Sequence, residues 1–437
     1  YENFKRTIII PQGQFKEFIE LGAKDRTQMM KEIFGLHRYD LQDKVAALNS
    51  QNLTNLNQLE GKLSSFEEVS EERIKELEDN LIEQTKVTNQ VQEEYNQLVK
   101  RAWDKIWLTN RGELTLELEG KLKNYLGVEN IIITNNGTIP IQIALKLLGN
   151  NGEIITTPFS YVATSAAIIW ENCKPVFVDI NADYLTIDET KIEAAITSKT
   201  TAILATHVFG NPCNIEAIEE IAKKHNLKVI YDAAHSFGVT YKDESLFNFG
   251  DVSTCSFHAT KLFHTGEGGA LFCKEKDLFH KLFYSHNFGH NGPLDFYGLG
   301  INAKISELQS AMGLAIFPYM DTIISERKKV VDFYNASLNF KILKGLKLRE
   351  NTSWNYSYFP VVFESEEQLL KVQKVLNEND IFPRRYFYPS LNTIQYVEGK
   401  EMPISESIAS RIICLPLYVG LSTNELEQIV SIINISI

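Results

Sequence analysis

Residues 254–272, TCSFHATKLFHTGEGGALF, carry the pattern that decides the fold. A strand-like run precedes Lys261, and a glycine-rich turn and a second apolar run follow it. A lone lysine is usually a solvated surface residue. Lys261, however, lies among apolar and small residues, where an amine loses hydration and its pKa falls below the ordinary value of about 10.4. Such an amine can form a Schiff base with a carbonyl compound.

Upstream of this stretch, short β-rich runs alternate with helical segments such as residues 215–225. This alternation predicts an α/β domain with a largely parallel sheet, whose ligand site lies at the carboxyl ends of the strands. The β-rich runs are IIIT at 131, PVFVDI at 175, TAILATHVFG at 201, KVIYDAA at 228 and GGALFC at 268.

The order of elements changes after Met320. A long helix, the strand-like run YFPVVF, a helix over 366–379, an apolar LPLY turn and a final helix follow. We expect a smaller α+β domain there.

The first hundred residues differ in composition from the rest. No proline occurs between Pro11 and Pro140, and ten of the sixteen glutamines lie in the first hundred residues. Apolar residues then recur at steps of three and four, a spacing that predicts a coiled coil or a long amphipathic hairpin. They include Leu56, Leu59, Leu63, Phe66, Ile74, Leu77, Leu81, Val91, Tyr95 and Leu98.

Length and charge limit the classes of function. The chain has 437 residues, 44% of them hydrophobic and 23% charged, which predicts a globular protein of two or three domains. A net charge of -12 argues against binding of nucleic acid or an anionic membrane through the overall charge of the protein. The apolar runs fall far short of the roughly 20 residues that cross a bilayer. Without a charged-then-apolar leader, we expect a cytoplasmic protein.

The five cysteines are an odd number without a CxxC pair, and we expect reduced thiols in the core.

A carboxylate in KVIYDAAHSFG (228–238) accompanies the lysine. Asp232 ends an apolar strand, so its side chain is expected at the carboxyl edge of the sheet. Alone, Asp232 is better explained as a helix cap. Together with Lys261 the pair favours pyridoxal phosphate (PLP), because a carboxylate beside the pyridine nitrogen keeps that ring protonated and electron-withdrawing.

Two further motifs suit the same cofactor. IIITNNGTIPIQIAL (131–145) predicts a strand, a turn and a helix whose first amides can hold a phosphate beside the Thr138 hydroxyl. A turn with a helix cap is an adequate explanation of NGT by itself. In TTPFSYVATSAA (156–167), Tyr161 can lay its ring on the cofactor or fill the core.

The order of these motifs, followed by GLGINAKISELQSAMGL (298–314), resembles the DegT/DnrJ/StrS family of PLP-dependent sugar aminotransferases over about residues 93–437. The family implies PLP fold-type I: a large domain with a mostly parallel seven-stranded sheet (93–325) and a small α+β C-terminal domain (326–437). We expect residues 1–92 to form an N-terminal helical or coiled-coil appendage.

The family pattern assigns roles to individual residues. Lys261 becomes the Schiff-base lysine and Asp232 the partner of the pyridine nitrogen. Tyr161 and Ala234 take the two faces of the ring, and His235 lies near its phenolic oxygen. The phosphate is assigned to Gly137, Thr138 and Ser256, with Asn287 reaching it from the neighbouring subunit of a homodimer.

The resemblance also implies the reaction. L-glutamate gives its amino group to the cofactor, which becomes pyridoxamine phosphate. A nucleotide-linked keto-deoxy sugar then takes that amino group, so ping-pong kinetics are expected. THVFGNPCNIEAIEEIAKKH (206–225) and FPRRYFYPSLNT (382–393) favour dTDP-4-keto-6-deoxyglucose, with the 3-keto isomer as the alternative.

Arg384 and Arg385 can pair with the diphosphate or be surface residues. Lys304 replaces the usual family arginine before the SEL helix, which removes a bidentate contact there.

A second resemblance concerns residues 1–92. TIIIPQGQFKEFIELGAKDRTQMMKEIFGLHRYD (7–40) resembles the Q-loop region of SbcC-type nuclease ATPases, with Gln12 as the glutamine. No GxxxxGK[ST] phosphate loop or LSGGQ-like signature accompanies it, so nucleotide hydrolysis is not expected. We interpret the segment as a fused helical appendage. The alternatives are a DNA-repair or scaffold role for this segment, and a PLP domain that acts as a regulator without turnover.

Overall fold

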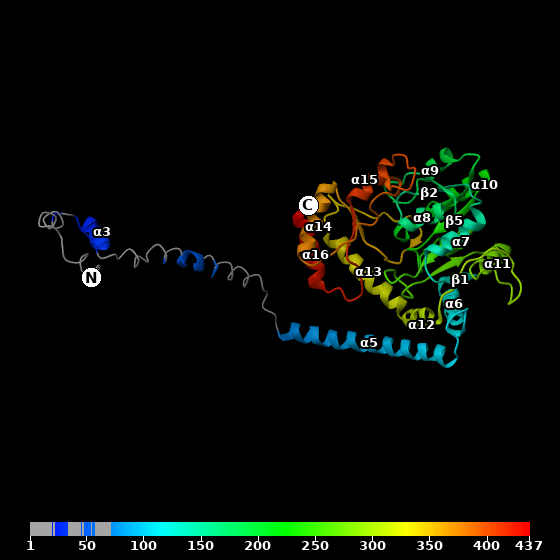
Figure 1. Ribbon diagram of the computed structural model, residues 1–437, viewed down its shortest axis with the longest axis horizontal. Coiled ribbons are helices and arrows are strands. Elements are labelled where there is room, and N and C mark those ends of the chain that lie inside the picture. The colour runs from blue at the N-terminus through cyan, green and yellow to red at the C-terminus, as the bar shows by residue number, and fades with distance from the viewer. Residues whose placement is uncertain (1–19, 21, 34–44, 46–47, 54, 57–70) are drawn as a thin grey trace, which may run out of the picture. The chain divides into compact units, whose positions relative to one another are not determined.

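A computed structural model describes residues 20, 22–33, 45, 48–53, 55–56 and 71–437 (Figure 1). The chain divides into two compact units, Tyr1–Lys86 and Val87–Ile437. The first contains helix α3 (Ala23–Ile33) and the beginning of helix α5 (Glu71–Asp104). Gln12 and most of the SbcC-like segment lie outside the described residues.

The second unit is built on a seven-stranded sheet in the order β1-β9-β8-β5-β4-β2-β3. Strand β9 runs antiparallel to both of its neighbours, and the other pairs are parallel. The predicted mostly parallel sheet is therefore confirmed. Its strands are β1 (Ile131–Thr134), β2 (Glu153–Thr156), β3 (Lys174–Phe177), β4 (Thr200–Thr206), β5 (Lys228–Asp232), β8 (Val252–Ser256) and β9 (Gly269–Phe272).

Helices cover both faces of this sheet because successive strand residues point to opposite sides. Ile154 and Ile230 pack with the residues of α7, α8 and α11, whereas Ile203 and Tyr231 pack on the other side with those of α10. Helices α6 and α12 cover the β1–β9 end of that second face. The bounds are α6 (Glu113–Leu126), α7 (Thr138–Leu148), α8 (Val162–Trp170), α9 (Glu189–Ile192), α10 (Ile215–His225), α11 (Lys276–Ser285) and α12 (Glu307–Ile316).

Local sequence explains where these helices begin and end. The Asn214 side chain accepts from the Ala217 amide at the start of α10, and Asn226 ends that helix at φ 51°, a left-handed conformation that asparagine tolerates. Ser306 and Gln309 form a reciprocal capping box at the start of α12.

The C-terminal part forms a second core around the sheet β10-β12-β13. Helices α13, α14 and α16 enclose this sheet, as expected for a small α+β domain. The elements are α13 (Met320–Ser337), β10 (Lys344–Gly345), β12 (Pro360–Val362), α14 (Glu366–Glu378), α15 (Pro403–Arg411), β13 (Ile412–Cys414) and α16 (Thr423–Ser436).

A third small sheet, β11-β6-β7, joins the two parts of the second unit. Strand β11 (Thr352–Ser353) pairs with β6 (Thr240–Tyr241), which pairs with β7 (Glu244–Ser245).

The end of α5 belongs to the second unit. Ala102 lies in the core of that unit, and Tyr95, Leu98 and Val99 pack against it. The amphipathic spacing of this stretch therefore attaches the end of the helix to the core of the second unit. All five cysteines are buried free thiols, as predicted. Among the described residues, no helix is both long and apolar enough to span a membrane.

Candidate active site

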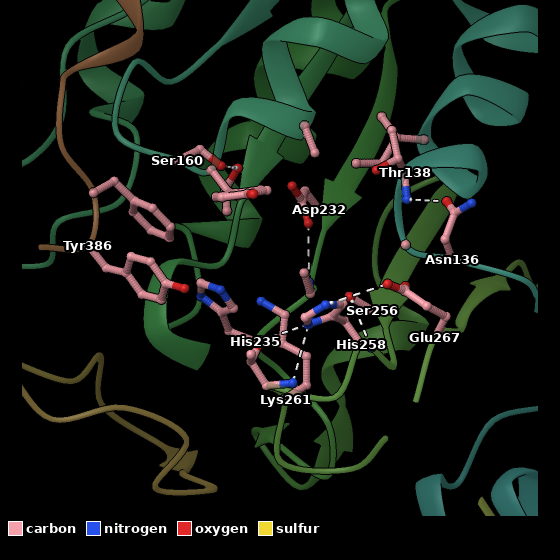
Figure 2. A pocket seen from close by; sticks show the side chains of 18 of the residues that line it. Asn136, Thr138, Ser160, Asp232, His235, Ser256, His258, Lys261, Glu267 and Tyr386 are labelled. Carbon is pink, nitrogen blue, oxygen red and sulfur yellow. Dashed lines mark hydrogen bonds and ion pairs between the residues drawn. The ribbon is translucent and has the colours of Figure 1, made fainter. Parts of the chain in front are cut away.

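A cavity of about 450 Å³ opens at the carboxyl ends of β4, β5 and β8, the edge at which parallel sheets bind ligands. This volume falls within the range of small-molecule sites. The cavity brings together every site residue expected from the sequence except Asn287 and Arg385. The expected residues that line the cavity are Gly137, Thr138, Tyr161, Asp232, Ala234, His235, Ser256, Lys261 and Arg384. Figure 2 labels Thr138, Asp232, His235, Ser256 and Lys261 among them.

Asp232 is the last residue of β5 and is only 5% exposed. Burial raises the pKa of its carboxyl group, while hydrogen bonds from the Thr164 hydroxyl and the Ala234 amide, and the charge of Lys261, lower it. The Thr164 Oγ1–Asp232 Oδ2 distance is 2.7 Å, and the Ala234 N–Asp232 Oδ1 distance is 3.2 Å. Both carboxylate oxygens thus have a donor, as an ionised carboxylate inside a protein requires.

Lys261 lies in the loop between β8 and β9. Burial lowers the pKa of its amine, and the charge of Asp232 partly opposes this effect. The side chain is within 3.4 Å of the Tyr358 hydroxyl. A desolvated amine at the mouth of a cavity has the properties of a nucleophile and proton carrier.

A phosphate cradle is formed where α7 begins. The Asn136 side-chain oxygen accepts from the amides of Thr138 and Ile139, each at 2.9 Å, so these two amides converge on one acceptor position. A side chain at Gly137 would not fit, because its Cβ would lie 2.6 Å from the Cβ of Ser256. The backbone can therefore approach an anionic group closely here.

His235 lines the same cavity in a defined tautomer. Its Nδ1 accepts from the Phe209 amide at 3.1 Å, so the proton of the neutral ring is on Nε2. Burial, and the nearby charge of Lys261, hold the pKa of His235 well below its usual value. The ring is a neutral donor, packed parallel to the rings of Phe209 and Phe387.

Tyr161 and Ala234 also line the cavity, from the N-terminal end of α8 and the loop after β5. The Tyr161 side chain is 55% exposed, which leaves its ring available to a ligand.

The structure separates the two adjacent arginines. Arg384 lines the cavity, and its Nη1 donates to the Tyr386 hydroxyl at 3.1 Å. Arg385 points elsewhere, because its Nη2 donates to Glu366 at 2.9 Å and to the Ser410 carbonyl at 2.6 Å. Of these two arginines, only Arg384 is in a position to contact a ligand in this cavity.

Asn287 follows α11 and does not line the cavity of its own chain. Its backbone pairs with Asn302, and the neighbouring Lys304 donates from Nζ to the Asn302 side chain at 2.7 Å. Lys304 therefore has a local partner within its own chain.

Several residues at the site were not found from the sequence, and two of them, Thr164 and Tyr358, contact Asp232 and Lys261. Thr164 was inside a quoted motif, but its spacing from Asp232 in the chain gives no sign of contact. Tyr358 comes from the strand-like run of the C-terminal domain, and only the fold brings it to Lys261.

These residues fit PLP: a buried carboxylate for the pyridine nitrogen, a desolvated lysine for the aldehyde and a glycine-lined helix start for the phosphate. The fold and the site together define a fold-type I PLP-dependent aminotransferase. A family model covers residues 89–434, and the chain belongs to the DegT/DnrJ/EryC1/StrS aminotransferase family.

Named relatives cover most of the chain. The dTDP-4-amino-4,6-dideoxy-D-glucose transaminase of Shigella dysenteriae is 42% identical over 353 residues, which are 78% of this chain and 95% of that protein. The transaminase of the same name from Escherichia coli is 37% identical over 361 residues, 78% of this chain and 94% of that protein. The GDP-perosamine synthase of Escherichia coli O157:H7 is 31% identical, covering 77% and 93%.

Solved structures share the fold. DesI in the presence of its TDP-sugar product superposes with a TM-score of 0.75 at 28% identity, covering 79% of this chain and 90% of DesI. PseC of Helicobacter pylori gives a TM-score of 0.72 at 25% identity, covering 78% and 96%. The SbcC-like resemblance of residues 1–92 stays a prediction.

Proposed function

We propose that this aminotransferase transfers the amino group of L-glutamate to dTDP-4-keto-6-deoxyglucose and forms dTDP-4-amino-4,6-dideoxyglucose. The main support is that Lys261 and Asp232 line the same cavity in a chain that is 42% identical to a transaminase named for that product. The product of DesI is also a TDP-sugar.

The chemistry divides between the cofactor and the chain. When bound, PLP supplies an electron sink for the negative charge that develops at the substrate carbon. Asp232 would keep the pyridine nitrogen protonated, and the start of α7, with Thr138 and Ser256, would hold the phosphate. Lys261 takes a proton from the α-carbon of the amino donor and, in the second half-reaction, gives a proton to the carbon that receives the amino group. This role requires an amine that is partly neutral near pH 7.

His235 is assigned a donor role. With its proton fixed on Nε2, the neutral ring can donate to the phenolic oxygen of the cofactor without adding a positive charge. The neighbouring Tyr161 and Ala234 are assigned to the two faces of the cofactor ring.

Arg384 is assigned to the diphosphate of the nucleotide sugar, since a planar guanidinium suits phosphate oxygens. An Arg384→Gln variant should raise the KM for the sugar nucleotide more than the KM for glutamate. An equal change in both would contradict the assignment.

We further propose a homodimer in which Asn287 reaches the phosphate in the partner's site. The segment after Asn287 exposes a set of large apolar side chains, which a partner would cover. They are Phe288, Leu294, Phe296, Leu299 and Ile301. Mixing Lys261→Ala protomers with Asn287→Ala protomers should restore part of the activity, because one site in each hybrid then carries both residues. No recovery in a mixture shown to exchange subunits would exclude a shared site.

The free state of all five cysteines supports a reducing compartment, and we assign the protein to the cytoplasm.

Product analysis tests the substrate assignment. Purified protein is incubated with isotopically labelled glutamate and a panel of dTDP-, UDP- and GDP-linked 4-keto and 3-keto sugars, and products are identified by mass spectrometry. We expect label in dTDP-4-amino-4,6-dideoxyglucose. Label only in a 3-amino sugar, or in a GDP-linked product, would replace the proposed acceptor.

A further inference from the structure

Residues 354–358, which we call the strap, connect the C-terminal domain to the active site. The Trp354 indole donates to the Phe209 carbonyl at 2.8 Å, and the Asn355 amide donates to the carbonyls of His235 and Phe237 at 2.9 and 2.8 Å. The strap is therefore bonded to the backbone beside the cavity histidine.

Helix α13 holds the strap from the other side. Arg327 donates from Nε to the Tyr356 carbonyl at 2.9 Å and from Nη2 to the Ser357 carbonyl at 2.6 Å. Burial lowers the pKa of Arg327 to about 10, but the guanidinium stays charged at neutral pH. Charge-assisted bonds of this kind restrict the backbone that leads into Tyr358.

Tyr358 is the last residue of the strap, and its hydroxyl lies beside Lys261. The Lys261 Nζ–Tyr358 Oη distance is 3.4 Å, and the Tyr358 ring lies 4.6 Å from the His235 ring, centroid to centroid. Burial raises the pKa of the phenol, so the hydroxyl is protonated at neutral pH and can both donate and accept.

We propose that Tyr358 is a positioning residue for Lys261: its hydroxyl holds the free ε-amine between the two proton transfers of the reaction. Within residues 71–437, the hydroxyl is the one side-chain group that hydrogen-bonds to Lys261 Nζ. A phenol accepts from the ammonium form and donates to the neutral form. It therefore holds the nitrogen in both protonation states, and it holds the charged ammonium form more strongly.

The charged and titratable groups that face Lys261 act differently. Burial lowers the pKa of the lysine, the charge of Asp232 opposes this effect and the charge of Arg384 adds to it. The buried Cys255 thiol is neutral, because burial raises its pKa. His235 is neutral. A carboxylate bonded directly to Nζ would strongly favour the ammonium form and hinder proton removal, whereas a neutral hydroxyl favours that form only slightly.

The test is Tyr358→Phe in the full-length chain, which keeps the ring against His235 and removes only the hydroxyl. The reactivity of Lys261 toward acetic anhydride is measured against pH by mass spectrometry, without added cofactor and after loading with pyridoxamine phosphate. Only the neutral amine reacts, so the profile reports the pKa of Lys261 without any sugar substrate. Tyr125→Phe, which removes a phenol bonded to Asp321 at 2.9 Å, is the matched control.

We expect the reactivity profile of Tyr358→Phe to move to lower pH by roughly half a unit to one unit, because hydrogen bonds to charged groups exceed those to neutral groups. We expect kcat to fall roughly five- to tenfold with the KM values within twofold. The Tyr125→Phe profile should match the unmodified chain.

An unmoved profile in Tyr358→Phe would overturn the proposal, even if kcat fell. The inference rests on the proposed aminotransferase class but not on the identity of the sugar. Because the reactivity profile is measured without sugar, it tests the role of Tyr358 separately from the proposed acceptor.

Discussion

The Thr164 hydroxyl donates a 2.7 Å hydrogen bond to the Asp232 carboxylate at the base of the cavity. Because the Thr164 hydroxyl uses its one proton in this bond, it must accept from the Ser160 hydroxyl, 2.8 Å away. The Ser160 hydroxyl in turn accepts from the Thr206 hydroxyl at 3.1 Å. Three buried hydroxyls thus form a directed chain that ends on the carboxylate.

Replacing Thr164 by valine should weaken the support of Asp232. The substitution keeps the shape of the side chain but leaves Ser160 without its acceptor. It also removes the hydrogen bond to Asp232, so the pKa of the Asp232 carboxyl rises further. Because a hydrogen bond to a charged group contributes about 1.5–3 kcal/mol, kcat should fall about tenfold or more. Steady-state kinetics measure this change. Thr164→Ser restores the hydroxyl and should recover most of the activity; equal losses in both variants would refute the role of the hydroxyl.

Gly137→Ala should reduce cofactor affinity. The new Cβ would lie 2.6 Å from the Ser256 Cβ, so the start of α7 must move away from the phosphate position. We expect the Kd for PLP, measured by fluorescence titration, to rise at least tenfold. Gly120→Ala is the control, because Gly120 lies within α6 with no atom within 4 Å of a Cβ, and it should stabilise the helix by up to about 1 kcal/mol. A similar Kd for all three proteins would argue against the cradle.

The buried histidines make stability depend on pH. Burial lowers the pKa of His207 to about 3, far below the value of about 6.5 expected in the unfolded chain. Between these values the unfolded state binds a proton that the folded state does not, so stability falls as pH falls below about 6.5. From pH 6.5 to 5, His207 alone should cost the fold about 2 kcal/mol.

Denaturant unfolding of the unmodified chain and of His207→Gln checks this dependence. The variant should show a shallower slope of unfolding free energy between pH 6.5 and 5, whatever its stability at pH 7. Parallel slopes would show that His207 titrates normally in the folded state.

A chain that begins at Val87 should keep aminotransferase activity. The compact unit begins at that residue, and the α5 residues that pack on its core, Tyr95, Leu98 and Val99, are retained. We expect kcat within twofold of the full-length value. Loss of cofactor binding in a folded truncated protein would give residues 1–86 a part in the enzyme.

Sequence alone located the strands that end at Asp232 and precede Lys261, because apolar runs, glycine turns and polar strand ends are local signals. It also named nine of the residues that line the cavity, all but Arg384 through the family resemblance. Thr164 and Tyr358 were missed because their contacts join residues 68 and 97 positions apart, which no local pattern records. For the same reason, the adjacent Arg384 and Arg385 could not be separated until the turn of the backbone was known.

The most direct test of the account is the visible absorbance of the PLP-loaded protein. We predict a yellow protein whose colour is bleached by L-glutamate, because Lys261 and Asp232 together hold the cofactor and support the first half-reaction. Lys261→Ala should show neither the absorbance nor the bleaching. A protein that stays colourless after reconstitution, or a colour that glutamate does not change, would contradict the account.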